Sequence, residues 1–90
     1  MSDFRWIPVT ERLPDNLDEV IITWENISPL SYKCDRLTGV AVFYNNRWYW
    51  YTRFTREALK EYGRFRDMLI NDSIEIIAWM PLPEPYKKGD

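Results

Sequence analysis

Three tyrosines and two arginines lie close together in the middle of the 90-residue chain and are its best candidates for binding chemistry. They are Tyr44, Arg47, Tyr49, Tyr51 and Arg53. Tyrosine rings stack on flat groups such as nucleobases, and planar guanidinium groups match the geometry of phosphate oxygens. The combination predicts a binding site for a phosphate-bearing, nucleotide-like ligand. The alternative is that a helix covers these side chains and makes them part of the core.

Other kinds of site find little support in the sequence. The chain has no histidine, which excludes Ser-His-Asp and Cys-His catalysis and the usual histidine metal sites. Cys34 is the single cysteine, so no intrachain disulfide can form, and it has no histidine partner to activate it. Asp15, Asp18 and Glu19 lack the spacing and the glycine of a calcium-binding loop. We therefore expect no catalytic residues, no metal, no cofactor and no enzymatic activity.

Composition and charge limit the classes of partner. The net charge of −2 and the pI near 5.1 argue against general nucleic-acid binding, which normally requires an excess of basic residues. Neither a signal-peptide pattern nor an apolar run of about 18 residues is present, so we expect a cytoplasmic protein without a membrane anchor.

Aromatic residues make up 17% of the chain, which is difficult to bury in one small core. A symmetric homodimer is the expected consequence.

The tyrosines and arginines lie on a predicted β-hairpin. Two runs rich in β-formers, Val40–Tyr44 and Arg47–Tyr51, flank Asn45-Asn46, and asparagine tolerates the positive φ of a two-residue turn. Such a turn pairs Tyr44 with Arg47, Phe43 with Trp48, Val42 with Tyr49 and Ala41 with Trp50. Alternation then places Ala41, Phe43, Trp48 and Trp50 on the expected core face. The opposite face carries Val40, Val42 and, by continued parity as far as Arg53, all five candidate site residues.

The remaining elements predict an α+β fold in one domain over residues 1–90: a small antiparallel sheet with a central hairpin and one amphipathic helix packed on it. Strands are expected at Glu19–Trp24 and Ile74–Trp79, a long loop at 25–38 and an extended proline-rich tail at 81–90. The helix is expected within Phe54–Leu69, with Thr55 as N-cap and Asn71 as stop. Its predicted core stripe is Phe54, Ala58, Tyr62, Phe65 and Leu69, and its polar face includes Arg56, Lys60 and Arg64.

The two ends of the chain carry its most specific sequence patterns. These are WIPVTERLP at residues 6–14 and WMPLPEP at residues 79–85. Each contains a tryptophan close to prolines, which suit edge or extended packing, and we expect Trp6 and Trp79 to share one aromatic cluster.

The chain resembles the short phage and prophage proteins of the family called domain of unknown function 551. The resemblance is carried by these two ends and, between them, by Val20-Ile21-Ile22, Gly39-Val40-Ala41 and Trp48-Tyr49. The resemblance implies a viral or prophage setting and brings no established activity or site residues. In the family pattern a histidine often precedes the late tryptophan, where this chain has Ala78.

Two functions follow from these observations. The first is a phage-type accessory binding module that captures a nucleotide-derived signal of host defence through the tyrosine and arginine face. The second is a protein-binding module that blocks a host factor through exposed aromatic residues or through the proline-rich tail, since aromatic residues are enriched at interfaces.

Overall fold

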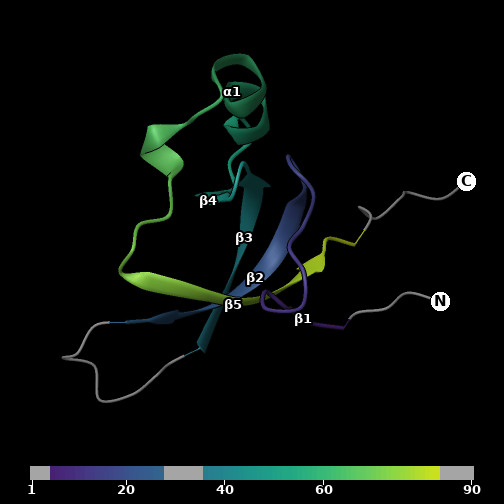
Figure 1. Cartoon of the computed structure of the whole chain (residues 1–90). Coiled ribbons are helices and arrows are strands. Elements are labelled where there is room, and N and C mark those ends of the chain that lie inside the picture. The colour runs from purple at the N-terminus through teal and green to yellow at the C-terminus, as the bar shows by residue number, and fades with distance from the viewer. Residues whose placement is uncertain (1–4, 28–35, 84–90) are drawn as a thin grey trace, which may run out of the picture.

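The structure, a computed structural model, describes residues 5–27 and 36–83, which form a five-stranded sheet, one α-helix and one short 3-10 helix (Figure 1). The strands are β1 (Ile7–Pro8), β2 (Glu19–Asn26), β3 (Arg36–Tyr44), β4 (Arg47–Trp50) and β5 (Ile74–Pro81). Helix α1 covers Thr55–Tyr62, and the 3-10 helix η1 covers Arg66–Met68. The strands pair antiparallel in the order β1-β5-β2-β3-β4. The predicted α+β class, with an antiparallel sheet and one helix, is confirmed.

The two strands of the predicted hairpin, β3 and β4, pair in the register expected from the sequence. The observed partners are Tyr44 with Arg47, Phe43 with Trp48, Val42 with Tyr49 and Ala41 with Trp50. Asn45 and Asn46 have φ values of 54° and 65°, the positive values that a type I′ turn requires at both central positions. Strand β4 ends at Trp50, however, and Arg53 lies in the turn before α1. The strand parity that was expected to place Arg53 beside the tyrosines therefore does not apply.

The hairpin lies at an edge of the sheet and not in its centre. Strand β5 returns between β1 and β2, which makes β2 the middle strand and leaves β4 with β3 as its strand neighbour. The chain that follows η1 covers the outer edge of β4: Leu69 bridges to Tyr49, and the Ile70 N–H donates to the Trp48 carbonyl at 2.9 Å. The opposite edge is the short β1, which contains Pro8, as the proline predicted.

Strands β2 and β5 include the two predicted strand segments and extend beyond them. The predicted loop at 25–38 is shorter than expected, because β2 continues to Asn26 and β3 already begins at Arg36. Residues 28–35, with Cys34 among them, lie outside the described residues, and so do residues 84–90 of the predicted tail. Pro81, the first residue of that tail, is the last residue of β5 and pairs with Val20.

One face of the sheet carries the larger core. Its buried members are Ile7, Val20, Ile22, Ala41 and Trp79, with Trp24, Trp48 and Trp50 packed against them. The rings of Trp24 and Trp50 meet edge to face, with centroids 5.8 Å apart. A Cβ atom at Gly39 would lie 3.1 Å from Cζ3 of Trp50, so glycine at this position lets the indole lie directly on the strand. This is the core face that alternation predicts.

The helix is shorter than predicted. It ends at Tyr62 because Gly63 adopts φ of 72° and its N–H donates to the Leu59 carbonyl at 2.8 Å, which closes the last turn. The prediction that the helix runs to Leu69 and stops at Asn71 is therefore wrong. Gly63 is therefore the C-terminal cap of α1 and does not lie inside a longer helix.

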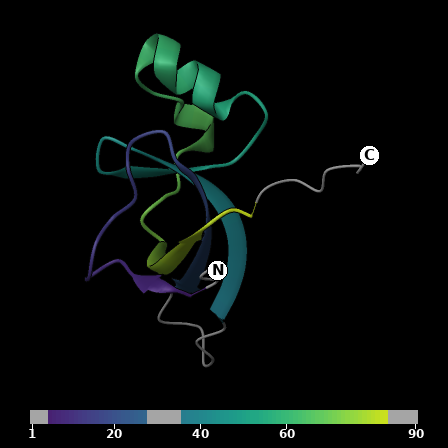
Figure 2. The ribbon, with the colours of Figure 1, turned by 90° about the vertical axis from the view of Figure 1, so that its right-hand side faces the viewer.

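The buried stripe of α1 also differs from the prediction. Thr55 and Leu59 are buried, whereas Phe54 is 61% exposed and Tyr62 is 71% exposed. Figure 2 shows the reason: α1 lies above one end of the curved sheet instead of lying across its face. The narrow side that meets the sheet is centred on Leu59, and Phe54 and Tyr62 of the predicted stripe are turned toward solvent.

Thr55 is buried inside the first helical turn and is not the N-cap, which is Phe54. Its hydroxyl donates to the Trp50 carbonyl at 2.9 Å and accepts the Thr52 N–H at 2.9 Å. These bonds tie the start of α1 to the end of β4 and satisfy a polar group that would otherwise be costly to bury.

A smaller second core lies on the opposite face of the hairpin. It is formed by Val42 of β3, Tyr49 of β4 and Leu59 of α1, all at most 3% exposed. Tyr44, Phe65 and Met68 pack against it from its rim. Both faces of the hairpin are therefore covered, which the alternation pattern alone does not indicate.

The two ends of the chain meet, but not through both tryptophans. Ile7 pairs with Trp79 between β1 and β5, and the Trp79 indole N–H donates to the Arg12 carbonyl at 2.9 Å. The Arg12 guanidinium lies 5.2 Å from the centre of the same indole. Trp6 is 39% exposed and is not part of the core that contains Trp79, because its neighbour Ile7 takes the inward position on this two-residue strand.

Among the described residues, none of the helices has the length and apolar character needed to cross a membrane.

Candidate functional site

The five residues predicted to form one binding face are distributed over several environments. Tyr49 is 3% exposed, and Tyr44 is half-buried at the rim of the same core. Tyr51 is exposed beside Arg56 and Leu82, and Arg53 lies over the ring of Phe54 at 5.1 Å. The face is therefore neither wholly buried nor continuous.

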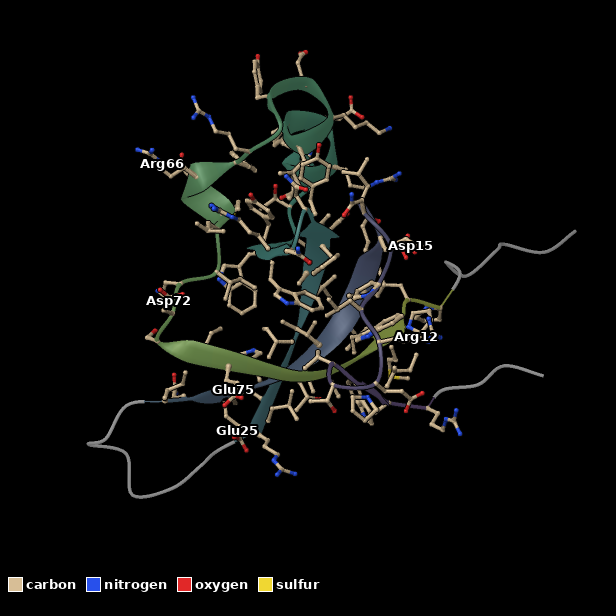
Figure 3. The ribbon with its side chains drawn as sticks, viewed as in Figure 1. Arg12, Asp15, Glu25, Arg66, Asp72 and Glu75 are labelled. Carbon is tan, nitrogen blue, oxygen red and sulfur yellow. The ribbon has the colours of Figure 1, made fainter. Side chains whose placement is uncertain are left out.

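Arg47 and Tyr49 do line a common cavity at the outer edge of β4. Its other lining residues are Arg64, Arg66 and Leu69, which come from the segment after α1 and from η1 with the residue that follows it. We call this cavity the arginine pocket. Figure 3 shows Arg66 on η1, on the outer side of the molecule.

The local sequence explains why two arginines reach this place. After the cap at Gly63 the chain is extended at Phe65, with φ of −147° and ψ of 80°. Arg64 lies between the cap and this extended residue, and Arg66 begins the 3-10 helix η1. Phe65 packs against the second core, and the two arginines are left on the outside, opposite Arg47 of β4.

The size of the arginine pocket suits a single small group. Its volume is about 140 Å³, which corresponds to roughly five water molecules at ~30 Å³ each. Cavities that enclose a whole small-molecule ligand begin at about 300 Å³. The pocket can therefore hold one charged head group but not a complete nucleotide.

The pocket is strongly positive. Its lining includes three arginines and no acidic residue. Within residues 5–27 and 36–83, no carboxylate lies within ion-pair distance of Arg47, Arg64 or Arg66. Three unpaired cations repel one another, and an anion between them relieves that repulsion. Arginine binds oxyanions through fork-shaped pairs of N–H donors, and Tyr49, which also lines the pocket, has a hydroxyl group that can donate.

The arginine pocket itself has no acidic residue in its lining, although Asp72 and Glu75 line a separate hollow together with Arg47. Glu25 of β2 and Glu75 of β5 are cross-strand partners at the far end of the sheet from Arg66 (Figure 3). Glu25 also accepts a hydrogen bond from the Arg36 guanidinium at 2.8 Å. Asp67 follows Arg66 in the chain but lines a different hollow, described below. The charge of the arginine pocket is thus not cancelled from its own walls.

Sequence reasoning found Arg47 and Tyr49 but missed Arg64 and Arg66. The helix was expected to continue through both, which placed Arg64 on a solvated helical face together with Arg56 and Lys60. The available signal was Gly63, since glycine soon after an amphipathic run is typical of a helix C-terminus. A stop there places Arg64 in the connection that follows α1 and Arg66 at the start of η1.

Comparison with known proteins yields one match. Residues 5–87 match the family described as "Protein of unknown function (DUF551)". No curated protein and no solved structure matches the chain.

Proposed function

Since the chain belongs to the DUF551 family, whose function is unknown, we propose a function from its own surface: it is a non-catalytic binding module that holds the phosphate group of a small ligand in the arginine pocket. The observation that carries this proposal is the convergence of Arg47, Arg64 and Arg66 on one small cavity without a carboxylate. Such an arrangement is unfavourable when empty and becomes favourable when a dianion is bound.

Because Tyr49 is buried, it can contact a different part of the ligand from the one predicted from the sequence. Tyr49 was expected to stack a base, but its ring is packed in the second core and has no free face. Tyr49 also lines the arginine pocket, and in this proposal it contributes its hydroxyl group. The proposal therefore assigns the phosphate to Arg47, Arg64, Arg66 and the Tyr49 hydroxyl.

In its finer form, the proposal is that the phosphate belongs to a nucleotide-derived signal of host defence, which the protein sequesters. The support for it is the phosphate-sized pocket together with the phage setting implied by the sequence resemblance. A sequestering protein needs tight binding and no turnover, which agrees with the lack of a histidine-based catalytic group.

The test is the affinity for inorganic phosphate and for nucleoside monophosphates, measured by isothermal titration calorimetry at low salt. Replacing one arginine of the pocket, for example Arg64→Gln, removes a charged hydrogen bond worth about 1.5–3 kcal/mol, so we expect the affinity to fall by about 10- to 150-fold. Arg5→Gln is the matched control because Arg5 precedes β1 at the opposite edge of the sheet.

Tyr49→Phe is the informative change at Tyr49, since it keeps the buried ring and removes the hydroxyl. The larger change Tyr49→Ala empties part of the second core and tests folding only. Equal affinities for wild type, the Arg64→Gln variant and the Arg5→Gln variant would contradict the proposal, as would the absence of any phosphate binding.

A second candidate function is protein binding through α1, favoured by the exposure of Phe54 and Tyr62 on one helix face. Large exposed aromatic residues are common anchors at interfaces. The partner is a host protein or a second copy of the chain, and the proline-rich tail at 81–90 is an additional contact in this proposal. Light scattering of the purified protein over a range of concentrations distinguishes a homodimer from a monomer, and Phe54→Ala should shift the protein toward the monomer if α1 is the contact.

A further inference from the structure

A second hollow adjoins the arginine pocket, between the end of α1 and η1. It is lined by Ala58, Tyr62, Arg64, Phe65, Arg66 and Asp67. Arg64 and Arg66 line both cavities, so a ligand anchored by its phosphate in the pocket can extend past these arginines into the hollow. At about 510 Å³ the hollow lies within the range of ordinary ligand sites, which is about 300–1,000 Å³.

The walls of this hollow differ chemically from those of the arginine pocket. Tyr62 is 71% exposed, the most exposed of the large hydrophobic side chains described, and its ring has a free face for stacking. Asp67 adds a carboxylate, which repels a phosphate but accepts hydrogen bonds from hydroxyl and amino groups. The positive pocket and the mixed hollow thus favour two different parts of one ligand.

We infer that the hollow binds the nucleoside part of a nucleoside monophosphate, with the base stacked on Tyr62 and the sugar hydroxyls or a base amino group donating to Asp67. This inference rests on the proposed function, because the phosphate in the arginine pocket fixes the ligand beside the hollow. Tyr62 then supplies the stacking surface that the sequence had suggested for Tyr49.

The experiment compares inorganic phosphate, ribose 5-phosphate and adenosine 5′-monophosphate by calorimetry on the full chain. Stacking of one base on an aromatic side chain corresponds to an affinity gain of about 5- to 150-fold, so the nucleotide should bind that much more tightly than ribose 5-phosphate. Tyr62→Ala should remove this gain and leave the affinity for inorganic phosphate unchanged, whereas Tyr62→Phe should retain most of it.

Phe54→Ala is the matched control for Tyr62→Ala. Phe54 lies two turns earlier on the same helix face and is 61% exposed, but it does not line the hollow. Its replacement should leave the affinity for adenosine 5′-monophosphate unchanged. Because both side chains are exposed, neither change should unfold the protein.

The possible results separate this inference from the proposed function. If all three ligands bind with the same affinity, or if Tyr62→Ala leaves the nucleotide affinity unchanged, the nucleoside site is refuted and phosphate binding stands. If none of the three ligands binds, the proposed function fails as well.

Discussion

Leu59 is the apolar side chain through which helix α1 packs on the second core, and its contribution to stability can be compared with that of the exposed Tyr62. Leu59 is 1% exposed and packs with Val42 and Tyr49, whereas Tyr62 is 71% exposed. We expect Leu59→Ala to lower the free energy of unfolding by about 2–5 kcal/mol, because it leaves a cavity in the second core. At ~3 kcal/mol, the melting temperature of a domain this size falls by about 12–24 °C.

Tyr62→Ala should change the free energy of unfolding by no more than about 0.5 kcal/mol, because it removes little buried area and alanine is a better helix former. Urea unfolding followed by tryptophan fluorescence measures both variants under the same conditions. Leu59→Val is the milder version of the core change, should Leu59→Ala fail to fold. A larger loss for Tyr62→Ala than for the Leu59 variants would refute the observed orientation of α1 and restore the stripe predicted from the sequence.

Three further predictions concern the elements around the site. Thr55→Val should cost about 1–3 kcal/mol of stability in urea unfolding, because it leaves the partly buried Trp50 carbonyl without the Thr55 hydroxyl as donor, and an unchanged midpoint would contradict this. Gly63→Ala should cost about 1 kcal/mol by the same assay, since φ of 72° is unfavourable for alanine, while a stabilised variant would mean that the helix continues past residue 63. The affinity for a phosphate monoester such as adenosine 5′-monophosphate should fall as the pH drops through about 6, because the monoester takes up its second proton there while arginine stays charged. An affinity that stays constant from pH 5 to 8 would argue against recognition of the dianion.

Local patterns predicted the hairpin register correctly. Two asparagines between β-rich runs determine the turn, and a two-residue turn leaves one register for the flanking residues. The position of the hairpin in the sheet could not be predicted in this way, because it depends on where β5 returns. That pairing joins segments about fifty residues apart in the chain, and no local signal carries it.

The candidate site was predicted only in part, because its two halves come from distant segments. Arg47 and Tyr49 are on the hairpin and were identified from their residue types. Arg64 and Arg66 were missed because a helical period of three or four continued through Phe65 and Leu69 and concealed the stop at Gly63. Tyr49 was assigned to an open face because alternation gives two sides of a strand but does not show that Leu59 of α1 covers one of them.

The most direct test of phosphate binding in the arginine pocket is a titration of the isotopically labelled protein with inorganic phosphate, followed by NMR of the arginine side-chain Nε–Hε groups. If phosphate binds in the arginine pocket, the signals of Arg47, Arg64 and Arg66 shift together and saturate with a single dissociation constant, while those of Arg5 and Arg12 remain unchanged. If the arginine signals shift uniformly without saturation, or if the three pocket signals do not move, phosphate is not bound there and the proposed function is wrong.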